Sequence, residues 1–151
     1  MHYGNHAMTA ERTAFSRRVQ TSAGRLLRLS LALIYTWFGV LKLFGLSPAD
    51  ALVARTVTFI PFEVFFPLLG VWETAIGLGF LFPRTTPIAL VLMALQMPGT
   101  FLPLLMAPDV VFTRFPIGLT LEGQYIVKNL VLIAAGIAVW AEGSRRADSV
   151  K

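Results

Sequence analysis

Four long apolar segments decide what this chain can fold into. Each contains about 20 residues, the length of helix needed to cross a hydrocarbon core of about 30 Å. The segments occupy residues 26–46, 62–82, 87–106 and 124–141. Because lipid offers no partners to backbone N–H and C=O groups, each segment is expected to form a helix. The sequence therefore predicts an all-α, polytopic membrane protein, a bundle of four transmembrane helices.

The composition agrees with a protein that faces lipid. Hydrophobic residues make up 56% of the 151 residues and charged residues 14%. A typical soluble domain carries about 25% charged residues and keeps most of its apolar surface inside. A single domain of this length cannot bury so much apolar surface, so we expect the lipid bilayer to cover the remainder.

Most basic residues lie at the two ends of the chain. Eight of the 13 lysines and arginines flank the first and last apolar segments: Arg12, Arg17, Arg18, Arg25, Arg28, Arg145, Arg146 and Lys151. An excess of lysine and arginine marks the cytoplasmic side of a membrane protein, which predicts that both termini are cytoplasmic. Contact with anionic lipid head groups is a second interpretation of the same residues. The net charge of +5 therefore does not indicate nucleic-acid binding.

The chain divides into one membrane domain and two tails. Residues 1–24 are polar and lack an apolar stripe, which predicts a mobile, basic cytoplasmic tail. Residues 25–142 form the membrane domain, and residues 143–151 a second cytoplasmic tail. Between the first two segments, Ser47 followed by Pro48 and Asp50 is typical of a helix start. The sequence after it is too short to span the membrane, so we expect a short interfacial helix between transmembrane helices one and two.

A group of polar residues interrupts the apolar segments. Glu73 lies about 16 Å into the second helix, near the middle of the membrane, and Tyr35 and Gln96 reach a similar depth. Lys42 and Lys128 lie about one helical turn below the outer surface. Ionisable residues inside a membrane usually face the bundle and find partners there. These five residues are therefore predicted to form a central polar site that binds a ligand or organises the bundle.

Each of these residues also has a purely structural interpretation. Lys42 and Lys128 lie close enough to the surface for their ammonium groups to reach it instead of pairing with Glu73. Glu73 and Gln96 can serve as hydrogen-bonding contacts between helices rather than as ligand contacts. The sequence leaves both interpretations open. It does not decide whether the intramembrane charges are functional or structural.

Several kinds of chemistry are not expected. The chain contains no cysteine, and its two histidines, His2 and His6, lie outside the apolar segments. This removes thiolate catalysis, disulfide exchange, iron–sulfur ligation and intramembrane histidine-ligated haem. We therefore predict no catalytic residue, no metal site and no cofactor held by the chain alone.

Three groups of residues resemble a known family. Residues 28–42 (RLSLALIYTWFGVLK) and residues 70–78 (GVWETAIGL) resemble the first two helix motifs of the YkgB/RclC-type bacterial inner-membrane proteins, in the DoxX-like superfamily. Phe115-Pro116, Gly123 and residues 127–129 (VKN) are similar to the family's approach to its fourth helix. The resemblance covers about residues 28–142, in the expected order. Asn129 departs from it, because an aspartate commonly follows the lysine.

The resemblance implies a location and a physiological setting. It places the chain in the bacterial inner membrane and associates it with resistance to oxidants. It implies a non-catalytic accessory subunit that binds a protein partner, a second copy of itself or a small hydrophobic molecule. One alternative is a membrane subunit of a quinone-linked oxidoreductase, in which a lysine donates to quinone and Glu73 relays protons. A small-solute transporter is the other, although no internal repeat is evident.

The charge distribution generates a topology prediction. Reporter fusions after Ser144 and within residues 83–86 should read cytoplasmic, and fusions beside Arg55 or Arg114 should read periplasmic, because lysine and arginine are retained on the inner side. Paired phosphatase and fluorescent-protein reporters measure this directly. A periplasmic carboxyl terminus would require an odd number of spans and would contradict the layout.

Overall fold

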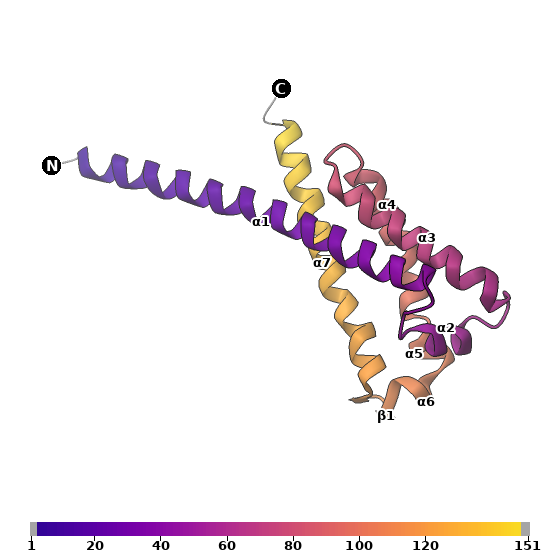
Figure 1. Ribbon diagram of the computed structural model, residues 1–151. Helices are drawn as coiled ribbons and strands as arrows, with labels where there is room; N and C mark the ends of the chain where they lie inside the picture. The colour runs from indigo at the N-terminus through magenta and orange to yellow at the C-terminus, as the bar shows by residue number, and fades with distance from the viewer. Residues whose placement is uncertain (1–2, 149–151) are drawn as a thin grey trace.

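Four long helices dominate the structure, as the apolar segments predict (Figure 1). The computed structural model describes the backbone of residues 3–148 and the side chains of Val19 and residues 22–145. The helices are α1 (Tyr3–Leu43), α3 (Phe62–Leu81), α4 (Thr86–Phe101) and α7 (Leu121–Asp148). Each contributes an apolar stretch long enough to cross a membrane, with α5 continuing α4 in the third. The protein is therefore an all-α, multi-pass membrane protein.

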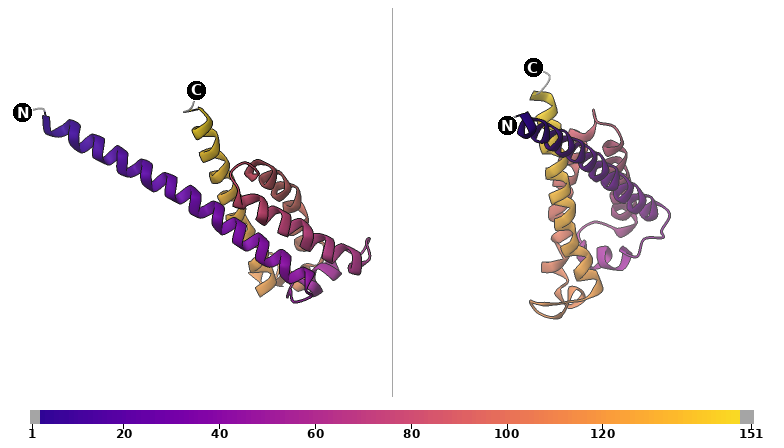
Figure 2. Two further views of the ribbon diagram at one scale, coloured as in Figure 1. Left: turned by 45° about the horizontal axis from the view of Figure 1, so that its top comes forward. Right: turned by 90° about the vertical axis from the view of Figure 1, so that its left-hand side faces the viewer.

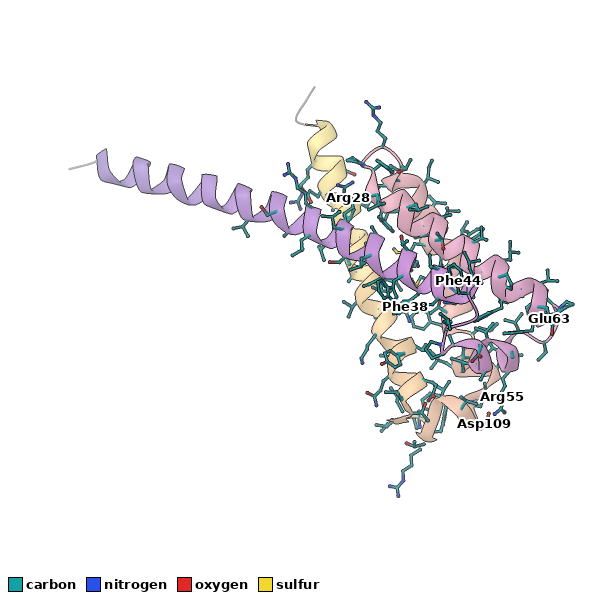
Figure 3. The ribbon with its side chains drawn as sticks, in the orientation of Figure 1. Arg28, Phe38, Phe44, Arg55, Glu63 and Asp109 are labelled. Carbon is teal, nitrogen blue, oxygen red and sulfur yellow. The ribbon has the colours of Figure 1, made fainter. Side chains whose placement is uncertain are left out.

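The short elements gather at one end of the bundle, which we name the cap (Figure 1). They are α2 (Asp50–Thr56), α5 (Pro103–Met106), α6 (Pro108–Val111), and the antiparallel strands β1 (Phe112–Arg114) and β2 (Gly118–Leu119). Helix α2 confirms the short helix expected between the first two spans. Arg55 of α2 and Asp109 of α6 form an exposed ion pair of 2.7 Å, which joins two connections that are distant in sequence (Figure 3).

The opposite end, which we name the tail end, brings together the start of the first span and the end of the last. A Cβ atom added to Gly24 of α1 would collide with the side chain of Glu142 of α7. The two chain ends therefore leave the bundle from the same side, as an even number of spans requires. Which side faces the cytoplasm remains a prediction from the charge pattern.

Helix α1 begins much earlier than the sequence analysis predicted. It starts at Tyr3 rather than near residue 26, and its first part extends away from the other helices (Figures 1 and 2). Residues 3–21 contain no proline and include Ala7, Ala10 and Ala14, which favour helix. Extending an existing helix needs no new nucleus, so this segment continues the transmembrane helix. The absence of an apolar stripe therefore does not imply the absence of helix.

Helix α1 also ends three residues earlier than predicted, at Leu43. Gly45 adopts the left-handed conformation with φ 65°, the N–H of Leu46 donates to the Leu41 carbonyl, and the N–H of Gly45 donates to the Lys42 carbonyl. These two bonds form a Schellman motif, which ends a helix at glycine. Helix α2 then starts at Asp50, with Ser47 Oγ accepting a hydrogen bond from the Ala49 N–H.

Close contact between α1 and α3 builds the core of the bundle. An added Cβ at Gly39 would lie 2.5 Å from the Thr74 backbone nitrogen and 2.7 Å from the Gly70 carbonyl oxygen. Gly77 lies equally close to the backbone of α1. Small residues let membrane helices approach in this way. The buried core lies toward the tail end from this contact and comprises Leu31, Ala32, Tyr35, Ile76, Phe80, Ala89, Met93, Met97 and Val139.

The contact predicts that Gly39→Ala destabilises the protein. The new methyl group would press on backbone atoms of α3 that cannot rotate away, and such overpacking costs about 1–3 kcal/mol. We expect a lower midpoint of thermal unfolding in detergent. Gly99→Ala is the matched control, because an added Cβ there meets nothing within 4 Å. An equal midpoint for the two variants would contradict the close α1–α3 contact.

Candidate functional site

Glu73 is the centre of the polar site. It lies eleven residues after the start of α3 and is 8% exposed, between the buried residues Gly70 and Ile76. A carboxylate at this depth is stable only when nearby groups replace the water it has lost. Two side chains from two other helices supply those groups.

Lys42 supplies the opposite charge. Its Nζ lies 2.6 Å from Glu73 Oε2, and both side chains are about nine-tenths buried. The sequence analysis left open whether Lys42 pairs with Glu73 or reaches the membrane surface. The structure has the ion pair, which joins the last turn of α1 to the middle of α3.

Gln96 of α4 binds the second oxygen of the same carboxylate. Its Nε2 donates to Glu73 Oε1 at 2.8 Å. A carboxylate only accepts hydrogen bonds, so the amide nitrogen must face Glu73 and the amide oxygen must face away. Gln96 Oε1 is buried and has no hydrogen-bond partner. We name the three residues Lys42, Glu73 and Gln96 the triad; it links α1, α3 and α4.

The close approach of α1 and α3 makes the ion pair possible. Gly39 lies three residues before Lys42, and Gly70 lies three residues before Glu73, so each glycine shares a helix face with a member of the triad. The two glycines meet at the contact described above. The glycines therefore set the distance between the helices one turn away from the two charges.

Tyr35 lies in the apolar core rather than in the triad. It is 5% exposed, and its ring centre lies 6.5 Å from that of Phe80. Tyr35 precedes Lys42 by two helical turns on the same face of α1. Among the hydrogen bonds of the described residues, none joins Tyr35 to the triad.

The structure places Lys128 outside the triad. Lys128 is exposed on α7, and its Nζ lies 4.9 Å from the centre of the Tyr125 ring, a cation–π contact. The inner face of α7 is marked by buried Ile126, and two residues of helix turn the chain by about 200°, to the opposite face. Asn129 beside it donates to carbonyls of its own helix.

Sequence reasoning did not find several polar contacts between segments, and two of them are described here. One is the Arg55–Asp109 ion pair of the cap. The other is the Trp72 indole N–H, which donates to the Leu92 carbonyl at 3.3 Å and joins α3 to α4. Both partners of the cap pair lie in connections whose mutual position depends on the packing of the whole bundle. No local pattern in the sequence indicates either contact.

The triad is a hydrogen-bonded network centred on the Glu73 carboxylate. Amine, carboxylate and amide groups form hydrogen bonds and can exchange protons, but they do not hold electrons at ordinary potentials. Each oxygen of Glu73 already has a partner, and the ion pair has no net charge. Within the part of the chain that the structure describes, no three histidine, cysteine or acidic side chains lie together as metal ligands would.

Comparison of the chain with protein-family models, with curated proteins and with solved structures gives no match. The class of the protein follows from its own architecture. Four apolar helices and a charge network buried between three of them define a polytopic helical membrane protein.

The triad predicts a non-additive response to substitution. Glu73→Gln leaves the Lys42 ammonium buried without a counter-charge, so we expect a loss of about 3–5 kcal/mol in stability. The double variant Glu73→Gln/Lys42→Met removes both charges and should recover part of that loss. Thermal unfolding in detergent of the natural sequence, of Glu73→Gln, of Lys42→Met and of the double variant measures the coupling between the two side chains.

Lys128→Met is the control for this series. Its ammonium lies outside the triad, so the change in stability should stay within about 0.5 kcal/mol. Strictly additive losses for Glu73→Gln and Lys42→Met would contradict the buried pair.

Proposed function

We infer that the protein is a non-catalytic accessory subunit of the bacterial inner membrane, which binds a partner protein or a small hydrophobic molecule in redox or oxidant-stress physiology. The motifs in residues 28–42 and 70–78, which resemble YkgB/RclC-type proteins, supply the physiological setting. The concentration of basic residues at both chain ends supports cytoplasmic termini.

The single observation that carries the non-catalytic role is the closed triad. Lys42 and Gln96 each donate to one oxygen of Glu73. A site in which Lys42 or Glu73 meets substrate would need one of these charges to be available. Here the charged groups meet each other and fix three helices at one relative position. This arrangement suits a rigid scaffold on which a second component docks.

One observation favours a second candidate, the membrane subunit of a quinone-linked oxidoreductase. Gln96 Oε1 is a buried acceptor without a donor, next to an ion pair. The hydroxyl group of a reduced quinone is a donor of the right kind, and Glu73 would then pass the proton onward. In this candidate the electrons still come from a cofactor on another protein, because the groups of the triad do not carry them.

Neither candidate gives the isolated chain a redox activity of its own. Purified alone, it should show neither haem nor flavin absorbance and should not transfer electrons from soluble donors to quinone. Such transfer should appear only when a cofactor-bearing protein is added, and should weaken with Glu73→Gln, which disturbs the scaffold. The spectrum and the rate of quinone reduction measure both. Turnover by the chain alone would overturn the accessory role.

A further inference from the structure

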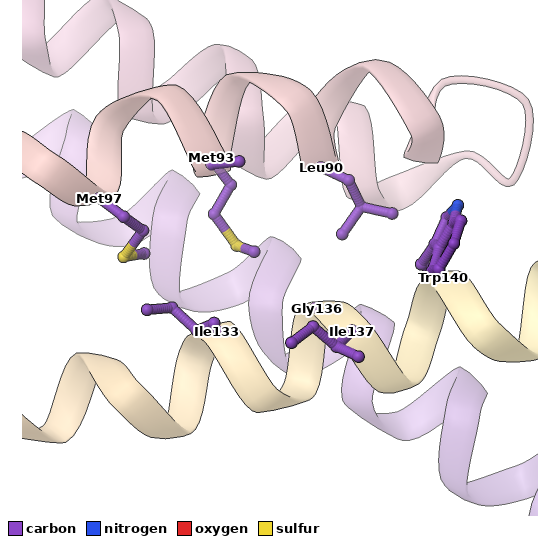
Figure 4. A pocket seen from close by; sticks show the side chains of 8 residues that line it. Leu90, Met93, Met97, Ile133, Gly136, Ile137 and Trp140 are labelled. Atoms are coloured by element: carbon purple, nitrogen blue, oxygen red, sulfur yellow. The ribbon is translucent and has the colours of Figure 1, made fainter.

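A groove runs between α4 and α7 (Figure 4). The triad holds α4 together with α1 and α3, whereas α7 contributes no residue to the triad. Its volume is about 340 Å³. Its walls are almost entirely apolar, with Leu90, Met93 and Met97 on α4 facing Ile133, Gly136 and Trp140 on α7. Both helices are membrane spans, so the groove lies within the hydrocarbon core.

Gly136 leaves room for the Met93 side chain in the wall of the groove. A Cβ atom there would run into the terminal methyl group of Met93, which reaches across from α4. Methionine is unbranched and flexible, so Met93 and Met97 can adapt to an occupant of irregular shape. Along the groove, α7 and α4 meet through apolar side chains.

A second hollow, of about 260 Å³, lies one helical turn closer to the tail end. Thr86 precedes Leu90 of the groove by four residues, and Gly143 follows Trp140 by three, which places the second hollow about 5–6 Å further along the same two helices. Its walls include two charges of opposite sign, Arg25 and Glu142. An apolar groove thus leads toward a hollow that carries a cation and an anion.

We propose that the two hollows together bind one glycerophospholipid with a zwitterionic head group of the phosphatidylethanolamine type. An acyl chain occupies the α4–α7 groove. The phosphate accepts hydrogen bonds from the Arg25 guanidinium, and the ammonium group donates to the Glu142 carboxylate. The site is independent of the accessory function inferred above.

The depth of each part fits a lipid. Arg25 lies four residues into the span Ser22–Leu43, and Glu142 lies near the end of the span Leu121–Arg145, so both are at the level of the head groups. Trp140 lies at the end of the groove nearest the second hollow and is 62% exposed. Tryptophan is enriched at this level of membrane proteins, where acyl chains meet head groups. A lipid has an apolar chain at one end and, in a zwitterionic head group, one negative and one positive charge at the other. It therefore matches the apolar groove and the charged hollow in order.

The pair of charges distinguishes this lipid from other occupants. An anionic head group without an amine would satisfy Arg25 but would be repelled by Glu142. A helix from a partner or from a second copy would fill the groove but would need its own pair of charges at the tail end. Because a carboxylate accepts several hydrogen bonds at once, Glu142 can keep its contacts within the protein while it binds the ammonium group.

Lipid retention tests the proposal. The full chain is reconstituted in vesicles with equal amounts of phosphatidylethanolamine and phosphatidylglycerol, extracted into mild detergent, and weighed by native mass spectrometry. We expect one retained phosphatidylethanolamine per chain, favoured about tenfold over phosphatidylglycerol, as a charge-assisted contact would produce. Equal retention of the two lipids, or of neither, would overturn the assignment.

Filling the groove should release the lipid. Gly136→Leu places a side chain in the space for the acyl chain, and we expect retention to fall about tenfold. Gly99→Leu is the matched control, because it adds the same side chain to α4 where an added Cβ meets nothing within 4 Å. Ala94→Leu fills the groove from its exposed α4 wall and gives a second test if Gly136→Leu folds poorly. Unchanged retention in a folded groove variant would contradict the proposal.

The head-group contact has its own pair of variants. Arg25→Gln should lower the retention of both lipids, because both carry the phosphate, whereas Glu142→Gln should remove the preference for phosphatidylethanolamine. Arg84→Gln changes an exposed arginine at the same end of the bundle but outside the hollow, so it should leave both retention and preference unchanged. A mass equal to two chains without lipid, lost on Gly136→Leu, would assign the groove to a second copy instead.

Discussion

The ion pair between Lys42 and Glu73 is the interaction on which the rest of the bundle depends. Each charge alone would be costly inside a membrane, so the two side chains constrain where α1 and α3 can lie. Gly39 and Gly70 meet this constraint by letting the two backbones touch one turn away. Gln96 then brings α4 to the free carboxylate oxygen. Three helices are thus positioned by one carboxylate.

The sequence predicted those parts of the fold that depend on local chemistry. Apolar length predicted the four spans, and helical rise placed Glu73 and Gln96 at one depth, where the structure has them hydrogen-bonded. A deep carboxylate needs a partner, and Lys42 was among the candidates. The two ends of α1 were harder to predict. Gly45 ends the helix through a conformation that composition does not reveal, and the helix begins at Tyr3, well before the apolar segment.

The parts that could not be predicted depend on how the helices are rotated. Lys128 is chemically equivalent to Lys42 in the sequence, at a similar depth and in a similar motif. Only the rotation of α7 about its own axis, with Ile126 facing inward, turns Lys128 and its helix neighbour Tyr125 away from the triad. The β1–β2 hairpin and the Arg55–Asp109 pair of the cap depend in the same way on where two distant connections meet.

The continuity of α1 has a mechanical consequence. Residues 3–21 are helical without a break from the transmembrane part, so they form an arm of about 28 Å at 1.5 Å per residue. Tyr3 lies 39 residues before Lys42, about 58 Å along the helix, so a tilt of about 10° about Lys42 moves the far end of this arm by about 10 Å. The span is held at its other end by the Lys42–Glu73 pair. A small shift at that buried pair is therefore amplified into a larger displacement of the amino terminus, outside the membrane.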